Sequence, residues 1–190
     1  DDCPAHGINW FMAATYCNIL SKHEGIPEDQ WCYEMNDAGY VTKPKPDHLK
    51  LTGYRLPTEA EWEYSCRGGA VTARFFGESD DLLPQYSWYI MNSQGRNWPV
   101  GTKKPNDFGL FDVIGNVFCW CDERFMNYPN GNGVTDDVEG PIAVDLFERV
   151  QRGGSINDMP GFVRSAVRAY NVPTFLSHHI GFRVARTIVP

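Results

Sequence analysis

The chain has 190 residues, of which 17 are basic and 24 acidic, so its formal net charge is -7. This length suits one domain over residues 1–190, with a core large enough to fold without disulfides. A hydrophobic share of 42% argues against intrinsic disorder, and no apolar run approaches the roughly 20 residues that cross a bilayer. The first residues, Asp1-Asp2-Cys3-Pro4, form neither a signal peptide nor a natural start. We therefore expect the C-terminal part of a longer protein, soluble and cytoplasmic, with no membrane partner.

Two segments have the periodicity and the capping residues of helices. Residues 10–22 follow Asn9, a predicted N-cap, and repeat apolar side chains on one face. A second helix is predicted to begin after Thr58, which is spaced with Glu61 as a capping box. Gly68 predicts the end of this helix, because glycine adopts the left-handed conformation that terminates many helices.

The rest of the chain is rich in turn formers, with 18 Gly and 13 Pro. Short runs of β-branched and aromatic residues predict strands at 75–76, 88–89, 116–121, 150–152, 162–168 and 181–185. The predicted fold class is therefore α+β with a high coil content. Long loops need aromatic side chains to hold them, and five tryptophans are placed to do so: Trp31, Trp62, Trp88, Trp98 and Trp120.

Positive charge gathers at the C-terminal end of the chain. Residues 149–190 contain six Arg, no Lys and one acidic residue, Asp158, whereas acidic residues prevail before them. An Arg-rich face can bind nucleic acid, but pairing of these Arg residues with the acidic part of the same chain accounts for the pattern more simply. We therefore predict internal ion pairs and no nucleic-acid partner.

The six cysteines do not read as a disulfide framework in a chain of this size. Cys17 and Cys66 fall on predicted helix faces and are expected to be buried. Cys119 and Cys121 point to the same side of a predicted strand, which can invite a metal. No CxxC or HxxxH spacing supplies the remaining ligands, however. We therefore predict reduced thiols and no metal.

Motifs of catalysis and nucleotide binding are not found. No Walker or dinucleotide glycine pattern occurs, and none of the five histidines forms a recognisable motif with a Ser or Cys nucleophile. The adjacent pair His178-His179 is not expected to chelate one ion, because neighbouring residues on an extended chain point to opposite sides. The residues alone therefore predict no catalytic group and no cofactor.

Four ordered segments carry a family resemblance: residues 53–64 (GYRLPTEAEWEY), 105–117 (PNDFGLFDVIGNV), 152–155 with 164–168 (RGGS and RSAVR), and 181–186 (GFRVAR). Together they resemble the formylglycine-generating enzyme (sulfatase-modifying factor) family. The resemblance implies a C-type lectin-like fold with two short helices and short, twisted antiparallel strands. It also implies that the Arg residues of the last two segments are buried and paired with the Glu residues of the first.

Two departures from the family pattern concern its metal sites. In the enzymes, two cysteines between the positions of Ser155 and Arg164 bind copper, whereas this stretch (INDMPGFV) contains none. A soft copper(I) ion requires thiolates. The family motif Gly-Asn-Val-Trp-Glu-Trp reads GNVFCW here, so Cys119 replaces a Glu that commonly binds calcium, and Asp112 alone does not restore an oxygen-ligand site. The resemblance therefore implies a chain without enzymatic activity and without these metals.

One non-catalytic branch of the family resembles this chain further: the variable proteins of diversity-generating retroelements. These proteins display a hypervariable C-terminal segment that binds diverse ligands, and residues 150–186 are the corresponding predicted variable segment. A fixed framework there alternates with residues typical of randomised Asn codons. The predicted ligand-binding residues are Ile156, Asn157, Phe162, Val167, Ala169, Tyr170, Phe175, Leu176, Ser177, His178 and His179, extended by Phe118 and Cys119.

The predicted partner is a protein or another macromolecule, because aromatic and His side chains on a rigid scaffold make adaptable contacts. The sequence leaves the oligomeric state open and is compatible with a monomer. A competing interpretation is that Phe175 and Leu176 pack against the body of the domain. Two other functions also stay open: an oxidoreductase of the formylglycine-generating type with a different metal site, and a regulatory module of a bacterial signalling protein.

Overall fold

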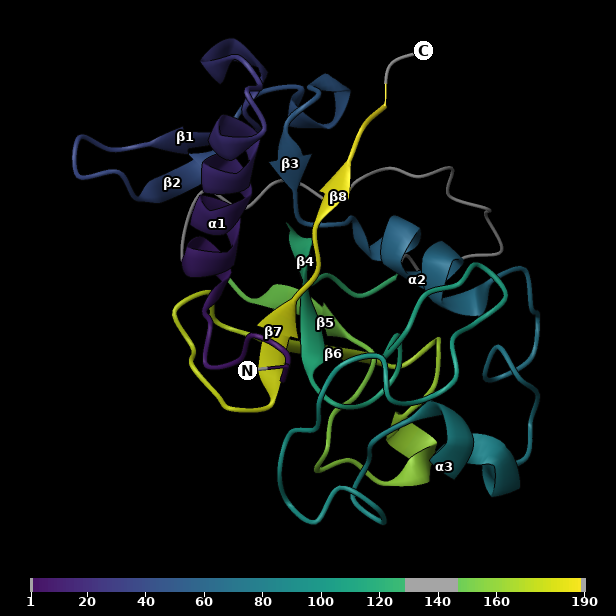
Figure 1. The fold of residues 1–190 in the computed structure, drawn as a ribbon. Coiled ribbons are helices and arrows are strands. Elements are labelled where there is room, and N and C mark those ends of the chain that lie inside the picture. The colour runs from purple at the N-terminus through teal and green to yellow at the C-terminus, as the bar shows by residue number, and fades with distance from the viewer. Residues whose placement is uncertain (1, 129–146, 189–190) are drawn as a thin grey trace.

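The structure is a computed structural model that describes residues 2–128 and 147–188 (Figure 1). Its described α-helices are α1 (Trp10–His23), α2 (Glu59–Arg67) and the short α3 (Leu83–Tyr86). Four 3₁₀ turns lie between them and beyond: η1 (Glu28–Gln30), η2 (His48–Lys50), η3 (Asp80–Leu82) and η4 (Pro160–Phe162). The described strands are β1 (Tyr33–Met35), β2 (Val41–Pro44), β3 (Tyr54–Arg55), β4 (Phe118–Arg124), β5 (Arg149–Arg152), β6 (Arg168–Asn171), β7 (Ile180–Phe182) and β8 (Ala185–Arg186).

A four-stranded sheet in the order β6-β5-β4-β7 forms the centre of the fold, beside the pairs β1-β2 and β3-β8. β5 runs antiparallel to β4 and β6, but β7 runs parallel to β4. The prediction of antiparallel strands is therefore wrong for β4 and β7. The reason is the connection through residues 172–179, which leads from the end of β6 back to the start of β4 before β7 begins (Figure 1). We call this connection the crossover loop.

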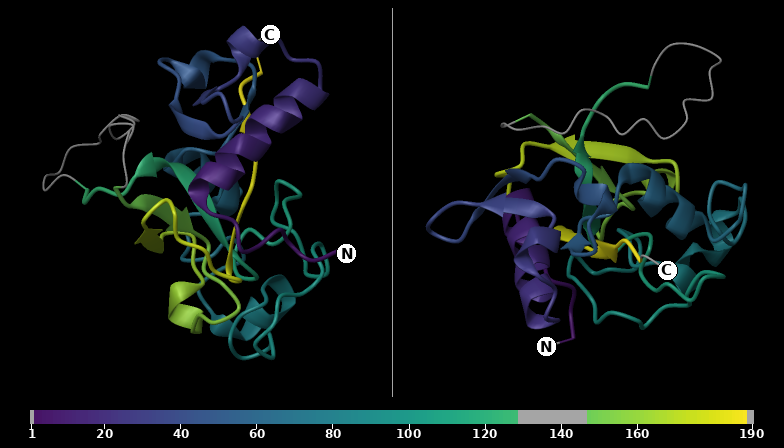
Figure 2. Two further views of the ribbon diagram at one scale, coloured as in Figure 1. Left: turned by 90° about the vertical axis from the view of Figure 1, so that its left-hand side faces the viewer. Right: turned by 90° about the horizontal axis from the view of Figure 1, so that it is seen from above.

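β4 separates two hydrophobic clusters, and α1 and α2 lie on opposite sides of it (Figure 2). Successive side chains of a strand point to opposite faces. Trp120 accordingly packs in the cluster beneath α1, whereas Cys119 and Cys121 both pack in the cluster beneath α2. The prediction that these two thiols share one side is confirmed, as is the burial of Cys17 and Cys66.

Both predicted helices form with their predicted caps. The Asn9 side chain accepts a hydrogen bond from the backbone N–H of Met12 at 2.9 Å and begins α1. Thr58 and Glu61 form the capping box of α2. Gly68 ends α2 at a φ of 56°, in the left-handed conformation that glycine adopts without a steric penalty.

Several strand predictions are wrong because aromatic residues hold coil instead. Residues 75–76 form a turn, in which Phe75 and Phe76 pack against Tyr86. Residues 88–89 are coil, and the Trp88 ring stacks on Trp98 with 4.3 Å between centroids. Clusters of aromatic residues in this chain therefore occur in loops held by ring packing as well as in strands.

Other strands differ in their boundaries. The strand predicted at 162–168 begins only at Arg168, because η4 and turns occupy the residues before it. The strand predicted at 181–185 is divided between β7 and β8. β1, β2 and β3 were not predicted, since strands of two to four residues are too short for alternation of side chains to be visible.

The tryptophans hold the coil as predicted. Four indole N–H groups donate to oxygen atoms of other segments at 2.7 to 3.0 Å: Trp31 to Ile26 O, Trp88 to Thr102 Oγ1, Trp98 to Ser93 O and Trp120 to Ile8 O. Trp62 instead packs in the cluster beneath α2. None of the helices within residues 2–128 and 147–188 is both long and apolar enough to cross a bilayer.

A buried polar network joins the first third of the chain to the sheet. Asp122 on β4 accepts hydrogen bonds from the Tyr33 hydroxyl at 2.8 Å and from His48 Nε2 at 2.7 Å. The Tyr33 oxygen in turn accepts the backbone N–H of Leu56 at 2.9 Å. Asp122, Tyr33 and His48 are all almost completely buried, so each of these bonds replaces water that the site excludes.

We expect Tyr33→Phe to lower the free energy of unfolding by about 2–4 kcal/mol, because it leaves one Asp122 oxygen and the Leu56 N–H buried without a partner. Urea denaturation would measure this. Tyr40→Phe is the matched control, since the Tyr40 side chain is 65% exposed. Equal stability losses in the two variants would contradict the assigned role of the network.

Candidate functional site

The framework of the C-terminal segment is held by Arg152 at the end of β5. Its side chain is completely buried. The guanidinium pairs with Glu63, lies 3.6 Å from a Glu59 oxygen, and donates to the carbonyls of Val167 and Ser165 at 2.8 and 2.9 Å. One side chain therefore connects β5, α2 and the residues that lead into β6.

Arg168 makes a second, bidentate pair with Glu59 at 2.6 and 2.7 Å. We call Arg152, Arg168, Glu59 and Glu63 the arginine clamp. The predicted Arg–Glu pairing is confirmed for Arg152 and Arg168. It is wrong for the other framework arginines, which meet loop carbonyls rather than carboxylates. Their acceptors are Gly161 O for Arg164, Phe111 O and Asp112 O for Arg183, and Thr52 O for Arg186. The predicted burial is wrong for Arg164 and Arg186, which are exposed.

The turn after Arg152 depends on glycine. Gly154 has a φ of 72°, and a Cβ there would lie 2.9 Å from the carbonyl oxygen of Phe162. The following Ser155 donates through its backbone N–H and its hydroxyl to Asp158 Oδ2, at 2.8 and 2.5 Å. The segment therefore leaves the sheet in one defined direction.

A buried carboxyl lies beside the clamp, at the first turn of α2. Glu123 on β4 accepts the backbone N–H of Glu59 through both oxygens, at 2.7 and 2.8 Å. Burial, and then the charge of Asp122, raise the pKa of Glu123 to about 8 although these hydrogen bonds oppose the change. The folded protein thus retains a proton here that the unfolded chain releases.

The predicted ligand-binding residues divide by exposure. Six are exposed at the surface: Asn157, Phe162, Tyr170, Phe175, Leu176 and His178. Five are half-buried: Val167, Ala169, Ser177, His179 and Phe118. The large apolar members are notable, because Phe162 and Leu176 expose 59% and 55% of their surface.

The remaining two predicted residues do not reach this surface. Ile156 is completely buried, with its N–H bonded to Asn116 O and its carbonyl bonded to Ser93 Oγ. Cys119 is buried in the cluster beneath α2. Their assignment as ligand contacts is wrong. Ile156 follows the framework turn into the interior, and the Cys119 side chain lies on the face of β4 that points to the core.

Four polar residues of the segment meet in what we call the histidine cluster: Asn157, Ser177, His178 and His179. His179 Nδ1 lies 3.2 Å from Asn157 Nδ2 and 3.5 Å from His178 Nε2, and its Nε2 lies 3.0 Å from Ser177 Oγ. The prediction that the two His rings point apart is wrong, because residues 178–179 form a turn and not extended chain. Partial burial, and then His178, lower the pKa of His179.

Main-chain hydrogen bonds hold the crossover loop against the N-terminal segment. Pro173 O accepts the N–H of Trp10, and Ser177 O accepts the N–H of Gly7, both at 3.0 Å. Phe175 and Leu176 lie between these anchors and keep 42% and 55% of their surface exposed. The loop is therefore fixed in its backbone while its largest side chains face solvent.

Tyr170 and Phe162 lie on other parts of the segment. The Tyr170 ring packs on Phe125 with 4.3 Å between centroids. Phe162 ends η4, whose backbone is held by Arg74 through the carbonyls of Pro160 and Val163. The displayed side chains thus extend over several elements and do not form a single pocket.

The residues present do not fit the metal centres that the family resemblance implies. Residues 156–163 carry no thiol, and burial raises the pKa of Cys66 to about 11 and that of Cys121 well above its usual value, which opposes the thiolate form that copper needs. Cys119, at the position of the calcium-binding Glu, is buried and supplies no oxygen. Among the described residues, no group of three or more His, Cys, Asp or Glu side chains is arranged to hold a metal.

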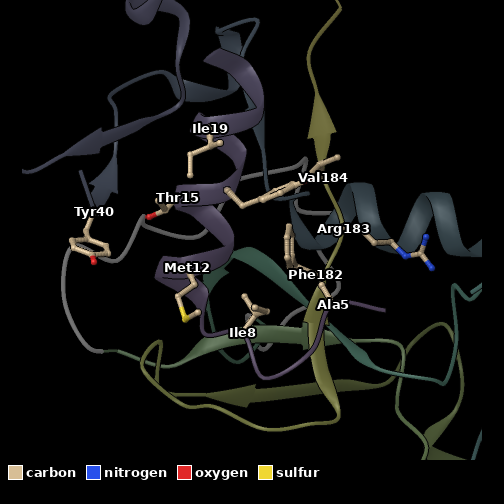
Figure 3. A pocket seen from close by; sticks show the side chains of 10 residues that line it. Ala5, Ile8, Met12, Thr15, Ile19, Tyr40, Phe182, Arg183 and Val184 are labelled. Atoms are coloured by element: carbon tan, nitrogen blue, oxygen red, sulfur yellow. The ribbon is translucent and has the colours of Figure 1, made fainter. Parts of the chain in front are cut away.

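An apolar groove of about 600 Å³ was not predicted (Figure 3). It lies between α1 and the chain at β7 and β8, and its lining includes Ile8, Met12, Ile19, Phe182 and Val184. The sequence signal was present: Met12, Tyr16 and Ile19 recur at helical spacing on the side of α1 that faces away from the core, and each is about half exposed. The helix therefore has two apolar faces, of which only one is covered by the core.

Residues 1–188 match the family described as sulfatase-modifying factor enzyme 1-like domain. The chain is also similar to a formylglycine-generating enzyme, to part of a protein kinase and to a variable protein of known structure. The formylglycine-generating enzyme of Streptomyces coelicolor is 35% identical over 73% of this chain and 48% of its own length. The serine/threonine-protein kinase pkn1 of Chlamydia caviae is 33% identical over 74% of this chain and 22% of its own length. The chain thus spans about half or less of these two relatives.

Among solved structures, Treponema denticola variable protein 1 superimposes with a TM-score of 0.84. The two are 30% identical, and the match covers 97% of this chain and 71% of the Treponema protein. The arrangement of helices and short sheets is therefore the C-type lectin-like arrangement of this family, as the sequence motifs predict.

We expect Glu123→Gln to change how stability depends on pH. Because the pKa of Glu123 is about 8 when folded and near 4.5 when unfolded, the folded state binds more protons between these values, and parent stability falls as pH rises through them. The variant lacks this titration, so its free energy of unfolding relative to the parent should rise by about 3 kcal/mol between about pH 5 and pH 8.

Chemical denaturation at a series of pH values would measure this difference. Glu24→Gln is the control, since Glu24 lies at the exposed end of α1. Parallel pH profiles for parent and Glu123→Gln would show that Glu123 titrates as in the unfolded chain.

Proposed function

The chain belongs to the family of sulfatase-modifying factor enzyme 1-like domains, and on this premise we propose that it is a non-catalytic, receptor-like domain that binds a ligand through a variable C-terminal surface. The surface comprises the exposed and half-buried residues of segment 150–186, together with Phe118. The partner is a protein or another macromolecule.

The observation that carries this proposal is the contrast between the buried framework residues of the segment and its exposed side chains. Arg152 is buried and bonded to fixed partners, and Gly154 is buried where a Cβ would clash with Phe162 O. Phe175, Leu176 and His178 instead project from a loop whose main chain is anchored at both ends. A fixed backbone with exposed aromatic and polar side chains lowers the entropy cost of binding and tolerates replacement of those side chains.

The structural similarity supports the same function. The solved structure with a TM-score of 0.84 is named a variable protein. The match includes the framework and the crossover loop, since it covers 97% of this chain. In the variable proteins that the sequence resembles, diversity is confined to the C-terminal part, and the corresponding part of this chain exposes Phe162, Phe175 and Leu176.

The enzymatic alternative has less support. Relatives that generate formylglycine are as similar in sequence, but the copper-binding thiols are replaced between Ser155 and Arg164, and the thiols on β4 are buried. One observation favours the regulatory alternative. The region of the Chlamydia caviae protein kinase that matches this chain makes up only 22% of that kinase. A receptor-like domain joined to an effector would satisfy both that observation and our proposal.

Sequencing the 3′ end of the gene across a population of the source organism tests the proposal. We expect amino-acid changes to concentrate at displayed positions such as Phe162, Phe175 and His178, while Arg152 and Gly181 stay constant. Synonymous changes should be distributed evenly and serve as the control. An invariant segment, or changes spread equally over framework and display, would remove the support for a diversified surface.

The division into buried framework residues and exposed residues predicts that substitutions in the two groups change the free energy of unfolding by different amounts. Leu176→Ser and His178→Ala should change the free energy of unfolding by no more than about 0.5 kcal/mol, as exposed substitutions do. Arg152→Met should lower it by about 3–5 kcal/mol, because it leaves Glu63 and two carbonyls without their buried partner. Urea denaturation of the three variants measures this, and comparable losses in all three would argue that the display residues are structural.

A further inference from the structure

The histidine cluster brings two imidazole nitrogens toward one point. The turn at residues 178–179 places His178 Nε2 and His179 Nδ1 3.5 Å apart, with the rings at 80° and their centroids 4.7 Å apart. Two imidazole nitrogens that bind one ion at about 2.0–2.1 Å lie roughly 3.3–3.6 Å from each other at tetrahedral to trigonal angles. The observed separation of 3.5 Å falls in that interval.

A third donor faces the same point. The side-chain amide of Asn157 lies 3.2 Å from His179 Nδ1. Rotation of this amide by half a turn exchanges its nitrogen for its oxygen, since the two differ only in the hydrogen bonds they make. In the rotated form Asn157 presents a carbonyl oxygen beside His179 Nδ1.

The other nitrogen of His179 is already oriented. Its Nε2 lies 3.0 Å from Ser177 Oγ, and when this nitrogen carries the proton, Nδ1 is left as a lone pair for an ion. An outer partner of this kind sets the tautomer and ring direction in metal sites. Ser177 therefore acts as a positioning residue for the cluster.

The backbone around the cluster is fixed before any ion arrives. His178 O accepts the Asn97 side chain at 2.7 Å, His179 O accepts the Phe118 N–H at 2.9 Å, and the Ile180 N–H donates to Ser177 O at 3.1 Å. An ion would thus have to order only the outer parts of the side chains.

We propose that His178 and His179, with Asn157 as a third ligand, bind one divalent transition-metal ion that takes imidazole in tetrahedral geometry, such as Zn²⁺. Water, or a donor atom of a bound ligand, completes the coordination. The site uses neither cysteine nor carboxylate, which distinguishes it from the copper and calcium centres of the family enzymes. It does not depend on the proposed receptor function and can fail without affecting it.

Isothermal titration of the 190-residue chain with Zn²⁺ tests the proposal. We expect saturable binding of one ion per chain, weakened at least about tenfold by His178→Ala and by His179→Ala, and also weakened by Asn157→Ala. His23→Ala is the matched control, because His23 is also an exposed histidine at the end of an element and should leave the affinity unchanged.

A second measurement locates the ion independently of affinity. Paramagnetic broadening by Co²⁺, used as a substitute for Zn²⁺, should be strongest in amide NMR spectra at residues 157 and 177–180 and weak near His6 and His23. Thermal unfolding of each variant confirms that the fold is intact. No measurable binding, binding that persists in the His178→Ala/His179→Ala double variant, or broadening centred on other residues would each overturn the assignment and leave a simple hydrogen bond between the two rings.

Discussion

The buried guanidinium of Arg152 is the interaction on which the C-terminal half of the structure depends. Taking such a charge out of water costs several kcal/mol unless an opposite charge and hydrogen bonds compensate it. Here Glu63 on α2 and the carbonyls of residues 165 and 167 supply that compensation. Because these partners come from segments far apart in the chain, the compensation is complete only when β5, α2 and the approach to β6 have all packed together. Arg168 and Glu59 then extend the same arrangement to the edge strand.

This arrangement explains how the surface of the segment can differ in chemistry from its interior. The charged groups that determine its path are inside, and the side chains that face solvent contribute little to holding it. The crossover loop follows the same rule, since main-chain groups of Gly7 and Trp10 hold it while Phe175 and Leu176 face solvent. A protein of this design can exchange exposed residues without losing its fold, which is the physical requirement for a diversified binding surface.

β4 has a different role, because its side chains enter both hydrophobic clusters, the buried polar network and the start of α2. Trp120 belongs to the cluster beneath α1 and Cys119 to the one beneath α2. Asp122 joins the network of Tyr33 and His48, and Glu123 meets the start of α2. Outside these environments, an apolar groove runs along α1 (Figure 3). An exposed apolar face of this kind is typical of a surface that contacts another polypeptide or apolar ligand.

The sequence by itself determined the features that depend on neighbouring residues or on ordered motifs. The caps at Asn9 and Thr58 and the shared side of Cys119 and Cys121 follow from interactions within a few residues, and the four motifs identified the family fold. Only the tertiary structure decided that β7 runs parallel to β4, that Ile156 is buried, and that a turn brings the rings of residues 178 and 179 together. These features arise from contacts between segments distant in the chain, and local periodicity contains no information about which distant segment will cover or bend a given residue.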